Sequence, residues 1–196
     1  YNAKSAELKA ANGGKAVPSL LFQHVPVKEI YGMFTECKWN TDGAVYSRRD
    51  HKWYVLNEEM AKGDFGEAPC SENFDVHTGE YQAWVENGDI MGAFFAHDHN
   101  NNFVGKSADG IVMGYNGGTG FRAYGAKCGR TIRVFNLDEN AVTNYETHLI
   151  YYNELMGEKA SNPFFDTFSP SILNKIMKVF YAMFGWMIDL IQKPQR

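Results

Sequence analysis

The feature that most constrains how this chain folds is an apolar run that ends in two histidines. Residues Ile90–Phe95 are followed, after Ala96, by His97, Asp98 and His99. A short apolar run of this kind predicts a buried strand. Because side chains alternate along extended backbone, His97 and His99 are expected on one face, with Asp98 turned away. Imidazole is the commonest metal ligand in proteins, so the pair indicates a site for one metal ion or two close ions.

A third histidine stands in a similar context. Residues 17–23 read as another short buried strand, His24 follows it, and Val25-Pro26-Val27 turns the chain away. Ligand-binding side chains usually lie where a strand gives way to a loop. A lone histidine there is more often an ordinary polar residue with a hydrogen-bond partner. Three histidines at two such strand ends favour a metal site.

Charge and composition exclude some classes of function. The formal net charge is −4, so the chain has no basic field to attract nucleic acid. Three cysteines, Cys37, Cys70 and Cys128, form no close pairing motif, which leaves the redox compartment and the cellular location open. The longest uncharged stretch near the C-terminus, residues 179–188, is far shorter than the about 20 residues that cross a bilayer. We therefore expect no transmembrane segment.

The length of 196 residues suits one domain with a sizeable core. Residues 5–11 are good helix sequence that ends at Asn12-Gly13-Gly14. Since the chain begins within helical sequence, without an initiator Met, we expect it to be part of a longer protein.

The remaining segments predict a mixed fold. Residues 28–34 and 80–86 read as short helices, and residues 36–78 lack clear periodicity, so we expect a long irregular excursion that shapes a pocket. Short strands with glycine-rich connections are expected at residues 103–104, 110–113, 131–137 and 142–151.

The C-terminal residues 171–192 predict a helix with a broad apolar arc. The arc comprises Ile172, Leu173, Ile176, Met177, Phe180, Met183, Phe184, Met187, Leu190 and Ile191. An arc this wide needs cover on more than one side. We expect it to pack onto the domain, and the alternatives are self-association through this helix or contact with a membrane surface.

Taken in order, these features resemble the C-terminal half of a calcineurin-like metallophosphoesterase. The likeness runs from Tyr1 to about Tyr152. It is carried by His24-Val25-Pro26, by residues 79–90 leading into the H-D-H-x-N stretch, and by the glycines of residues 110–125. It implies an α/β (α+β) fold, the C-terminal half of a four-layer αββα sandwich, mainly β with flanking helices. Residues 1–152 would be the C-terminal part of the phosphoesterase domain, and residues 153–196 an extension with an amphipathic helix.

The resemblance also implies ligands. The family holds two metal ions with five sequence blocks, of which only the last two, a lone His and G-H-x-H, are present. His24 matches the lone His, and His97 and His99 match the final pair, so His24 and His97 would bind one ion and His99 the other. The ions would be Mn, Fe or Zn, and Asn101 is the candidate for substrate contact. The bridging carboxylate, the other acidic ligands and the proton donor would come from the missing N-terminal half.

Several look-alike motifs are set aside. Asp75-Val76-His77 spells the first block of the family and Gly63-Asp64-Phe65-Gly66-Glu67 resembles the second, but both fall in the wrong order along the chain. His51 and His148 have no motif context, so we assign them no role.

Two residues depart from the family pattern. Ala96 stands where the family usually has Gly, and the added methyl group is expected to narrow the cleft or disfavour a backbone angle. Asn102 stands where related sequences often carry Asp. Neither change removes a metal ligand.

The expected function is metal-dependent hydrolysis of a small phosphate ester, carried out by the intact protein and negligible in this chain alone. The competing interpretation is a non-catalytic β-rich binding module, for example one that stacks sugars on exposed rings, because aromatic residues make up 15% of the chain. A single-metal cupin is a further alternative, but its H-x-H is followed within a few residues by Glu, which residues 100–107 lack.

Overall fold

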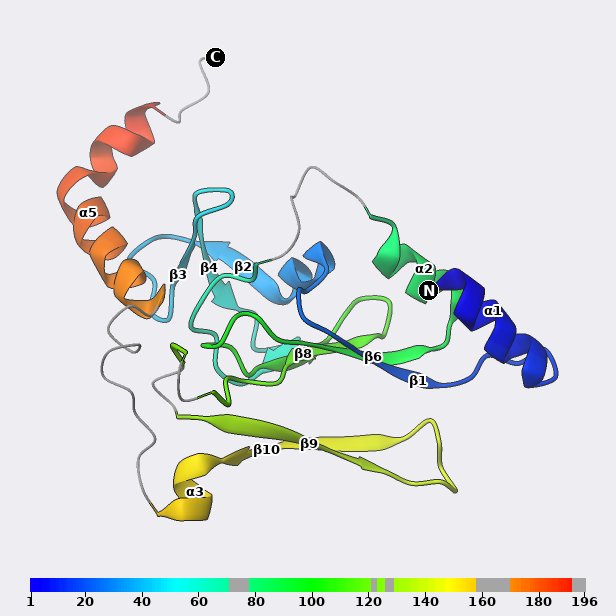
Figure 1. The fold of residues 1–196 in the computed structure, drawn as a ribbon. Helices are drawn as coiled ribbons and strands as arrows, with labels where there is room; N and C mark the ends of the chain where they lie inside the picture. Colours follow the sequence, from blue (N-terminus) through cyan, green and yellow to red (C-terminus); the bar gives the residue numbers. More distant parts are fainter. Residues whose placement is uncertain (71–77, 121–122, 126–128, 158–169, 192–196) are drawn as a thin grey trace.

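The computed structural model describes residues 1–70, 78–120, 123–125, 129–157 and 170–191, and within these ranges the chain folds around a five-stranded mixed sheet (Figure 1). The strand order is β1-β6-β8-β7-β5. The strands are β1 (Ser19–Gln23), β5 (Ala61–Lys62), β6 (Ile90–Phe95), β7 (Val104–Lys106) and β8 (Val112–Tyr115). β6 is parallel to both of its neighbours, β1 and β8. The carboxyl ends of β1 and β6 therefore lie at the same end of the sheet.

β6 is apolar throughout because both faces of the sheet are covered. Ala93 and Phe95 point into the main core, where each is 0% exposed. The core is closed by the 3-10 helix η1 (Lys28–Met33) and by α2 (Glu80–Asn87), whose Trp84 is also 0% exposed. α1 (Asn2–Ala11) lies beside α2, and its Ser5 hydroxyl donates a hydrogen bond of 2.7 Å to Asp89.

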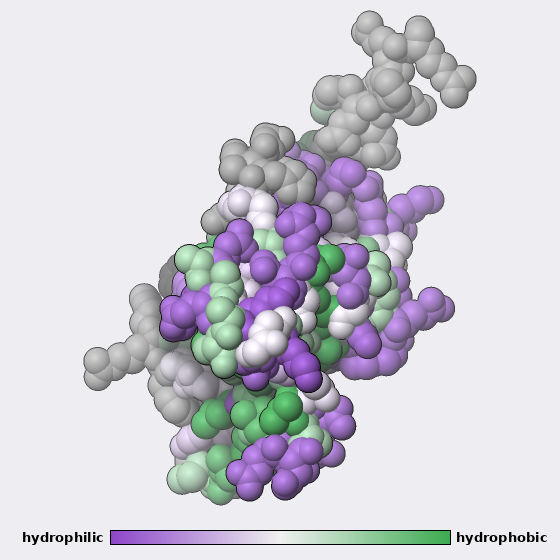
Figure 2. Space-filling view, turned by 90° about the vertical axis from the view of Figure 1, so that its right-hand side faces the viewer, coloured by the Kyte–Doolittle hydropathy of each residue, from purple (hydrophilic) through white to green (hydrophobic). Residues whose placement is uncertain are grey.

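A long β-hairpin covers the opposite face of the sheet (Figure 1). It consists of β9 (Thr131–Leu137) and β10 (Tyr145–Tyr151). Phe135 of β9 meets Phe94 of β6 edge-on, with ring centroids 4.6 Å apart. Figure 2 shows apolar surface over the lower part of the molecule, where the hairpin lies and where Leu137 and Val142 are exposed. The hairpin thus packs through one face and leaves apolar side chains at its far end.

The region between residues 34 and 62 corrects one sequence expectation. Instead of an irregular excursion, it contains an antiparallel sheet in the order β2-β4-β3, formed by β2 (Phe34–Cys37), β3 (Val45–Ser47) and β4 (Lys52–Leu56). All three residues of β3 are buried. Alternation of polar and apolar residues, the usual sequence signal of a strand, is therefore missing from β3.

The predicted C-terminal helix is α5 (Pro170–Ile191). Its Met177 and Tyr181 pack against a small core around Trp53 of β4, which confirms contact with the domain for one side of the arc. Phe180 and Met187 are each 43% exposed. Cover for that side by a second copy of the chain stays a prediction.

The fold class is α+β, with most strands in sheets and helices at their flanks, as expected for half of an αββα phosphoesterase sandwich. The helices among the described residues include none with the length and apolarity needed to span a bilayer. The division at residue 152 stays a prediction.

Gly92 marks the closest approach of the hairpin to β6 and generates the first prediction. A Cβ at this position would collide with the Tyr145 hydroxyl and would lie 3.0 Å from the Phe94 ring. Gly92→Ala should therefore lower the free energy of unfolding by about 1–3 kcal/mol, measured by urea denaturation. Within the described residues the buried Tyr145 hydroxyl has no hydrogen-bond partner, so Tyr145→Phe should restore part of the loss.

Gly32→Ala is the matched control, because a Cβ at Gly32 meets nothing within 4 Å. Equal stability of Gly92→Ala and wild type would show that the hairpin does not pack on β6 as described.

Candidate metal centre

His24 and His97 come together at the carboxyl ends of β1 and β6. His24 directly follows β1, and its backbone carbonyl accepts a hydrogen bond of 3.1 Å from Ala96 N, which extends the parallel pairing past the end of β6. The two imidazole rings have centroids 5.1 Å apart and planes tilted by 58°. Two histidines 73 positions apart in the sequence thus become neighbours because their strands pair in parallel.

The spacing of the two rings fits two ligands of one metal ion. An imidazole nitrogen binds zinc at about 2.1 Å and the ring centre lies about 1.1 Å further back, so two rings at a tetrahedral angle have centres about 5.2 Å apart. The observed 5.1 Å agrees with this value. The assignment of His24 and His97 to one ion stays a prediction, with which this spacing agrees.

The hydrogen bonds described for the His97 and His99 rings are made by Nδ1, so Nε2 of each ring is the nitrogen that could bind a metal ion. His99 Nδ1 lies 2.8 Å from the Tyr124 carbonyl oxygen, which can only accept, so Nδ1 carries the proton and Nε2 the lone pair. His97 Nδ1 lies 3.3 Å from Asp98 Oδ1. Metal-binding histidines are typically oriented in this way, by a carbonyl or carboxylate on the other ring nitrogen. The His99 ring is also stacked on the Tyr124 ring.

The backbone at His97 is in the left-handed region. Its φ is 69°, and the Asp98 amide donates to the Ala96 carbonyl at 2.8 Å, so His97 is the centre of a tight γ-turn. A non-glycine residue at positive φ is uncommon, and such strain collects at functional sites. Ala96 is not at positive φ. The departure from glycine at Ala96 therefore costs no backbone strain, contrary to one of the two effects that we expect from the sequence.

The described residues do not complete a metal site. Among them, no three His, Cys, Asp or Glu side chains are arranged to hold one ion. His99 accordingly does not share an ion with His24 and His97 in this arrangement. The assignment of His99 to a second ion, and of acidic ligands to other parts of the protein, stays a prediction.

The polar residues after His97 are mostly buried and hold a neighbouring loop. Asn101, expected to contact substrate, is 0% exposed. Its side-chain oxygen accepts hydrogen bonds of 3.0 and 3.2 Å from Gly66 N and Glu67 N, and its amide nitrogen donates to Glu67 O at 2.9 Å. Asn101 thus positions Glu67, and its role in substrate binding stays a prediction. Asp98 accepts from Tyr115 Oη at 2.6 Å.

Glu67 ends the look-alike motif that the sequence interpretation sets aside, yet the structure places it beside the predicted metal ligands. Its carboxylate accepts hydrogen bonds from Asn100 N at 2.9 Å and from Tyr124 Oη at 3.1 Å. Burial, with smaller opposing effects from these bonds, raises its pKa to about 8. Tyr124 Oη also lies 3.3 Å from the His97 carbonyl oxygen. The sequence around Glu67 does not predict its contacts, because its hydrogen-bond partners Asn100 and Tyr124 come from distant segments.

A cavity of about 240 Å³ adjoins this centre. It is lined by residues 46–49, residues 67–70, His97, Asp98, Tyr124, Tyr31 and Leu173 of α5. We call it the arginine pocket, after Arg48 and Arg49 in its wall.

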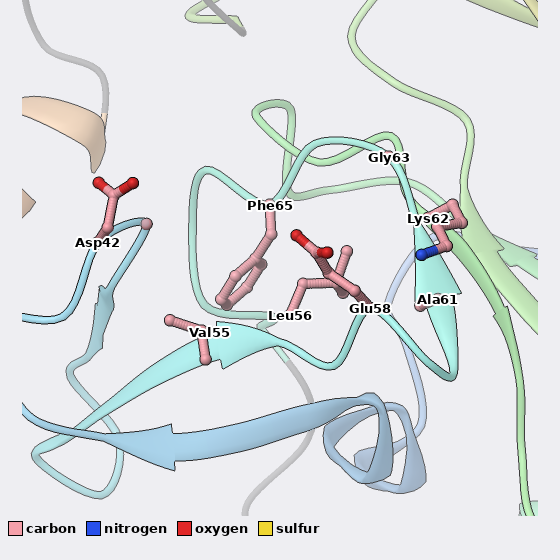
Figure 3. Close-up of a pocket in the computed structure, with 9 residues that line it drawn as sticks. Asp42, Val55, Leu56, Glu58, Ala61, Lys62, Gly63 and Phe65 are labelled. Carbon is pink, nitrogen blue, oxygen red and sulfur yellow. The ribbon is translucent and has the colours of Figure 1, made fainter.

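A second cavity, of about 360 Å³, lies between the C-terminal end of β4 and β5 (Figure 3). Its lining includes the apolar residues Val55, Leu56 and Phe65 and the charged residues Asp42, Glu58 and Lys62. Its lining, as far as the chain is described, includes none of the predicted metal ligands.

The residues set aside in the sequence also have structural placements. His51 Nδ1 lies 2.8 Å from Tyr46 Oη, and His148 is exposed on β10. Asp64 lies in a loop, where its backbone amide and its carboxylate are both hydrogen-bonded to the Asn102 side chain. Asp75-Val76-His77 lies outside the described residues.

Asn102 generates a second prediction, because its amide is matched to Asp64. The amide oxygen accepts from Asp64 N at 2.7 Å, and the amide nitrogen donates to Asp64 Oδ2 at 2.6 Å. Asn102→Asp would place a second carboxylate against Asp64 in a site that is 3% exposed. We expect a loss of about 1–3 kcal/mol in the free energy of unfolding at pH 7.

The double variant Asn102→Asp with Asp64→Asn restores one donor between the two side chains and should recover much of this stability. A double variant less stable than either single variant would contradict the pairing.

Glu67 generates a third prediction, on the pH dependence of stability. The folded pKa of about 8 lies above the ordinary value of 4.5, so the native state keeps a proton that the unfolded state releases. This contribution is complete below pH 4.5 and is lost as the pH rises through 8, with a slope of at most about 1.4 kcal/mol per pH unit. Wild type should therefore lose stability relative to Glu67→Gln when urea unfolding is compared at pH 5, 6, 7 and 8.

Glu58→Gln, at an exposed position, controls for the loss of a carboxylate alone. Parallel pH profiles for wild type and Glu67→Gln would rule out the raised pKa.

Comparison with known proteins places the chain near the phosphatases. Over 109 residues, 55% of its length, it is 31% identical to the Arabidopsis thaliana protein named "Probable inactive purple acid phosphatase 28". The match spans 21% of that protein, so the chain covers a small part of its relative. No family model and no solved structure matches the chain. The chain is therefore similar to part of a purple acid phosphatase, within the metallophosphoesterase superfamily.

Proposed function

We propose that this chain is part of a metal-dependent phosphoesterase and supplies the histidine ligands of its two-metal site. The observation that carries the proposal is the placement of His24 and His97, whose ring centroids are 5.1 Å apart at the ends of two parallel strands. The similarity to part of a purple acid phosphatase supports it. The identity of the ions, Mn, Fe or Zn, is left open by the ligand set.

Each histidine has a defined part in the proposal. His24 and His97 hold one ion, and His99 holds the second through Nε2, since its Nδ1 is bonded to Tyr124 O. Two divalent ions held there would supply Lewis-acid activation for hydrolysis of a phosphate ester. Asp98 orients His97, and Asn101 holds the loop of Glu67 beside them. Acidic ligands and the proton donor come from the N-terminal half of the domain.

A second candidate is a phosphatase-like protein without turnover. The name of the Arabidopsis relative contains the word inactive, and the described residues offer no third ligand to the His24 and His97 pair. The two candidates differ in one measurable property, which is hydrolysis by the intact protein with added metal.

The carbohydrate-binding alternative has less support. A sugar-binding module displays flat rings to solvent, whereas Trp53 and Trp84 are 4% and 0% exposed here. These rings fill the cores and are not arranged as a binding platform.

The test is hydrolysis of a chromogenic phosphomonoester with added manganese or zinc. We expect turnover by the intact protein and negligible turnover by the 196 residues alone. His97→Ala in the intact protein removes a direct ligand and should lower activity at least about 100-fold. His148→Ala, at an exposed position on β10, should leave the activity unchanged.

Zinc binding to the chain alone, followed by calorimetry, separates the candidates further. We expect one weak site that His24→Ala and His97→Ala each abolish. Robust turnover by the chain alone that survives His97→Ala would show that the chemistry lies elsewhere. Binding without turnover in the intact protein would favour the inactive relative as the better comparison.

A further inference from the structure

The arginine pocket joins the proposed metal centre to a second source of positive charge. Arg48 and Arg49 follow β3 directly and line the same cavity as His97. Both arginine side chains are exposed, so their guanidinium groups are accessible to a ligand that enters. Arg49 Nη2 donates a hydrogen bond of 2.9 Å to Cys70 Sγ, on the opposite wall.

The two acidic side chains described in the wall, Asp98 and Glu67, are buried, and the charge of Arg48 acts on Glu67. Asp98 is 4% exposed, and its Oδ2 already accepts from Tyr115 Oη and Cys70 N. Glu67 is 6% exposed and is held by Asn100 N and Tyr124 Oη. Burial raises the pKa of Glu67 to about 8, so it is largely uncharged at neutral pH. Among the charged side chains that the structure describes in the wall, the exposed ones are therefore the two arginines.

The pocket is also held in shape by the C-terminal helix. Asn174 in the first turns of α5 accepts from Tyr46 N at 3.1 Å and donates to Gly66 O at 3.2 Å. These two bonds join the strand that leads to Arg48 with the loop that carries Glu67. Leu173 of the same helix contributes an apolar wall. Because both walls of the pocket are already held in place, a ligand can bind without the loss of conformational entropy that ordering mobile walls would require.

We propose that the arginine pocket binds the phosphate group of a compact phosphomonoester through Arg48 and Arg49, beside the ion held by His24 and His97. Its role as a substrate site rests on the proposed function, whereas anion binding does not. Guanidinium groups recognise phosphate oxygens through paired hydrogen bonds, and this geometry is specific to arginine.

Size and charge narrow the substrate class. The volume of about 240 Å³ is below the range of about 300–1,000 Å³ typical of sites for larger ligands, so the organic group must be small. A monoester phosphate offers three free oxygens and close to two negative charges, whereas a diester offers two oxygens and one charge. Two adjacent arginines are therefore matched to the monoester.

The experiment titrates inorganic phosphate, methyl phosphate and dimethyl phosphate into the 196-residue chain at pH 7.5 without metal, followed by amide chemical shifts. We expect phosphate and methyl phosphate to shift the amides of residues 46–49 and of Glu67, Ala68 and Cys70, and dimethyl phosphate to bind at least tenfold more weakly. The double variant Arg48→Gln with Arg49→Gln should lose at least tenfold in affinity for methyl phosphate.

The double variant Lys9→Gln with Lys15→Gln is the matched control. It makes the same change in net charge at the α1 end of the molecule, away from α5 and β3 (Figure 1), and should bind as wild type does. Because Arg48 and Arg49 are exposed, their substitution should leave the thermal unfolding midpoint unchanged, which is checked in parallel.

The outcomes separate this proposal from the proposed function. Equal binding by wild type and the arginine variant, or shifts confined to other residues, would overturn the arginine pocket even if His24 and His97 bind zinc. Phosphate binding that depends on the arginines in a protein that fails to bind zinc would uphold the anion site and overturn the proposed metal centre. Equal affinity for methyl and dimethyl phosphate would overturn the monoester assignment.

Discussion

The parallel pairing of β1 and β6 is the constraint on which the rest of the structure depends. It runs from Ser19 opposite Ile90 to Gln23 opposite Phe95 and continues in the bond from Ala96 N to His24 O. Parallel pairs need both faces covered, and here the helices cover one face and the hairpin the other. The same pairing sets the 5.1 Å spacing of the His24 and His97 rings, so the core and the candidate centre share one cause.

Residues 97–102, which follow β6, combine two structural roles. His97 and His99 keep Nε2 available, whereas Asp98, Asn101 and Asn102 are at most 4% exposed and are bonded to the loop of residues 63–70. A buried polar side chain is stable only when its hydrogen bonds are made. The loop is therefore held against the centre by the same segment that presents the imidazoles. Glu67 and the wall of the arginine pocket take their positions from this arrangement.

The sequence predicts the parts of this structure that depend on local pattern. β9 matches its expected range because seven residues of strand sequence stand between clear turns. Where the chain is described, α5 includes all of the expected residues 171–191. His24 and His97 each follow a predicted buried strand, and their closeness follows because the two strands end at the same edge of the sheet. Predicting these features requires only the periodicity of apolar side chains along the sequence and the assumption that neighbouring strands pair.

Features built from distant contacts could not be predicted in the same way. The sequence of β3 shows no alternation of polar and apolar residues, because all three of its residues are buried. The hydrogen-bond partners of Glu67 are Asn100 and Tyr124, which lie 33 and 57 positions away in the sequence. The place of Asn101 in a motif predicts substrate contact, whereas its bonds to the backbone of the Glu67 loop could not be predicted from the motif. A motif shows which residues are adjacent in sequence, and the side-chain contacts decide what each one does.

The departure at Ala96 bears on the competence of the centre. If the left-handed residue were Ala96, the methyl group would carry a steric cost that glycine avoids. The structure instead places positive φ at His97, with the γ-turn closed by Asp98 N and Ala96 O. The strained position is thus the candidate ligand itself, and it is held by the Asp98 side chain, which is buried and bonded to Tyr115. The backbone therefore tolerates alanine at 96, and in the proposed centre competence would depend on acidic ligands from outside the described residues.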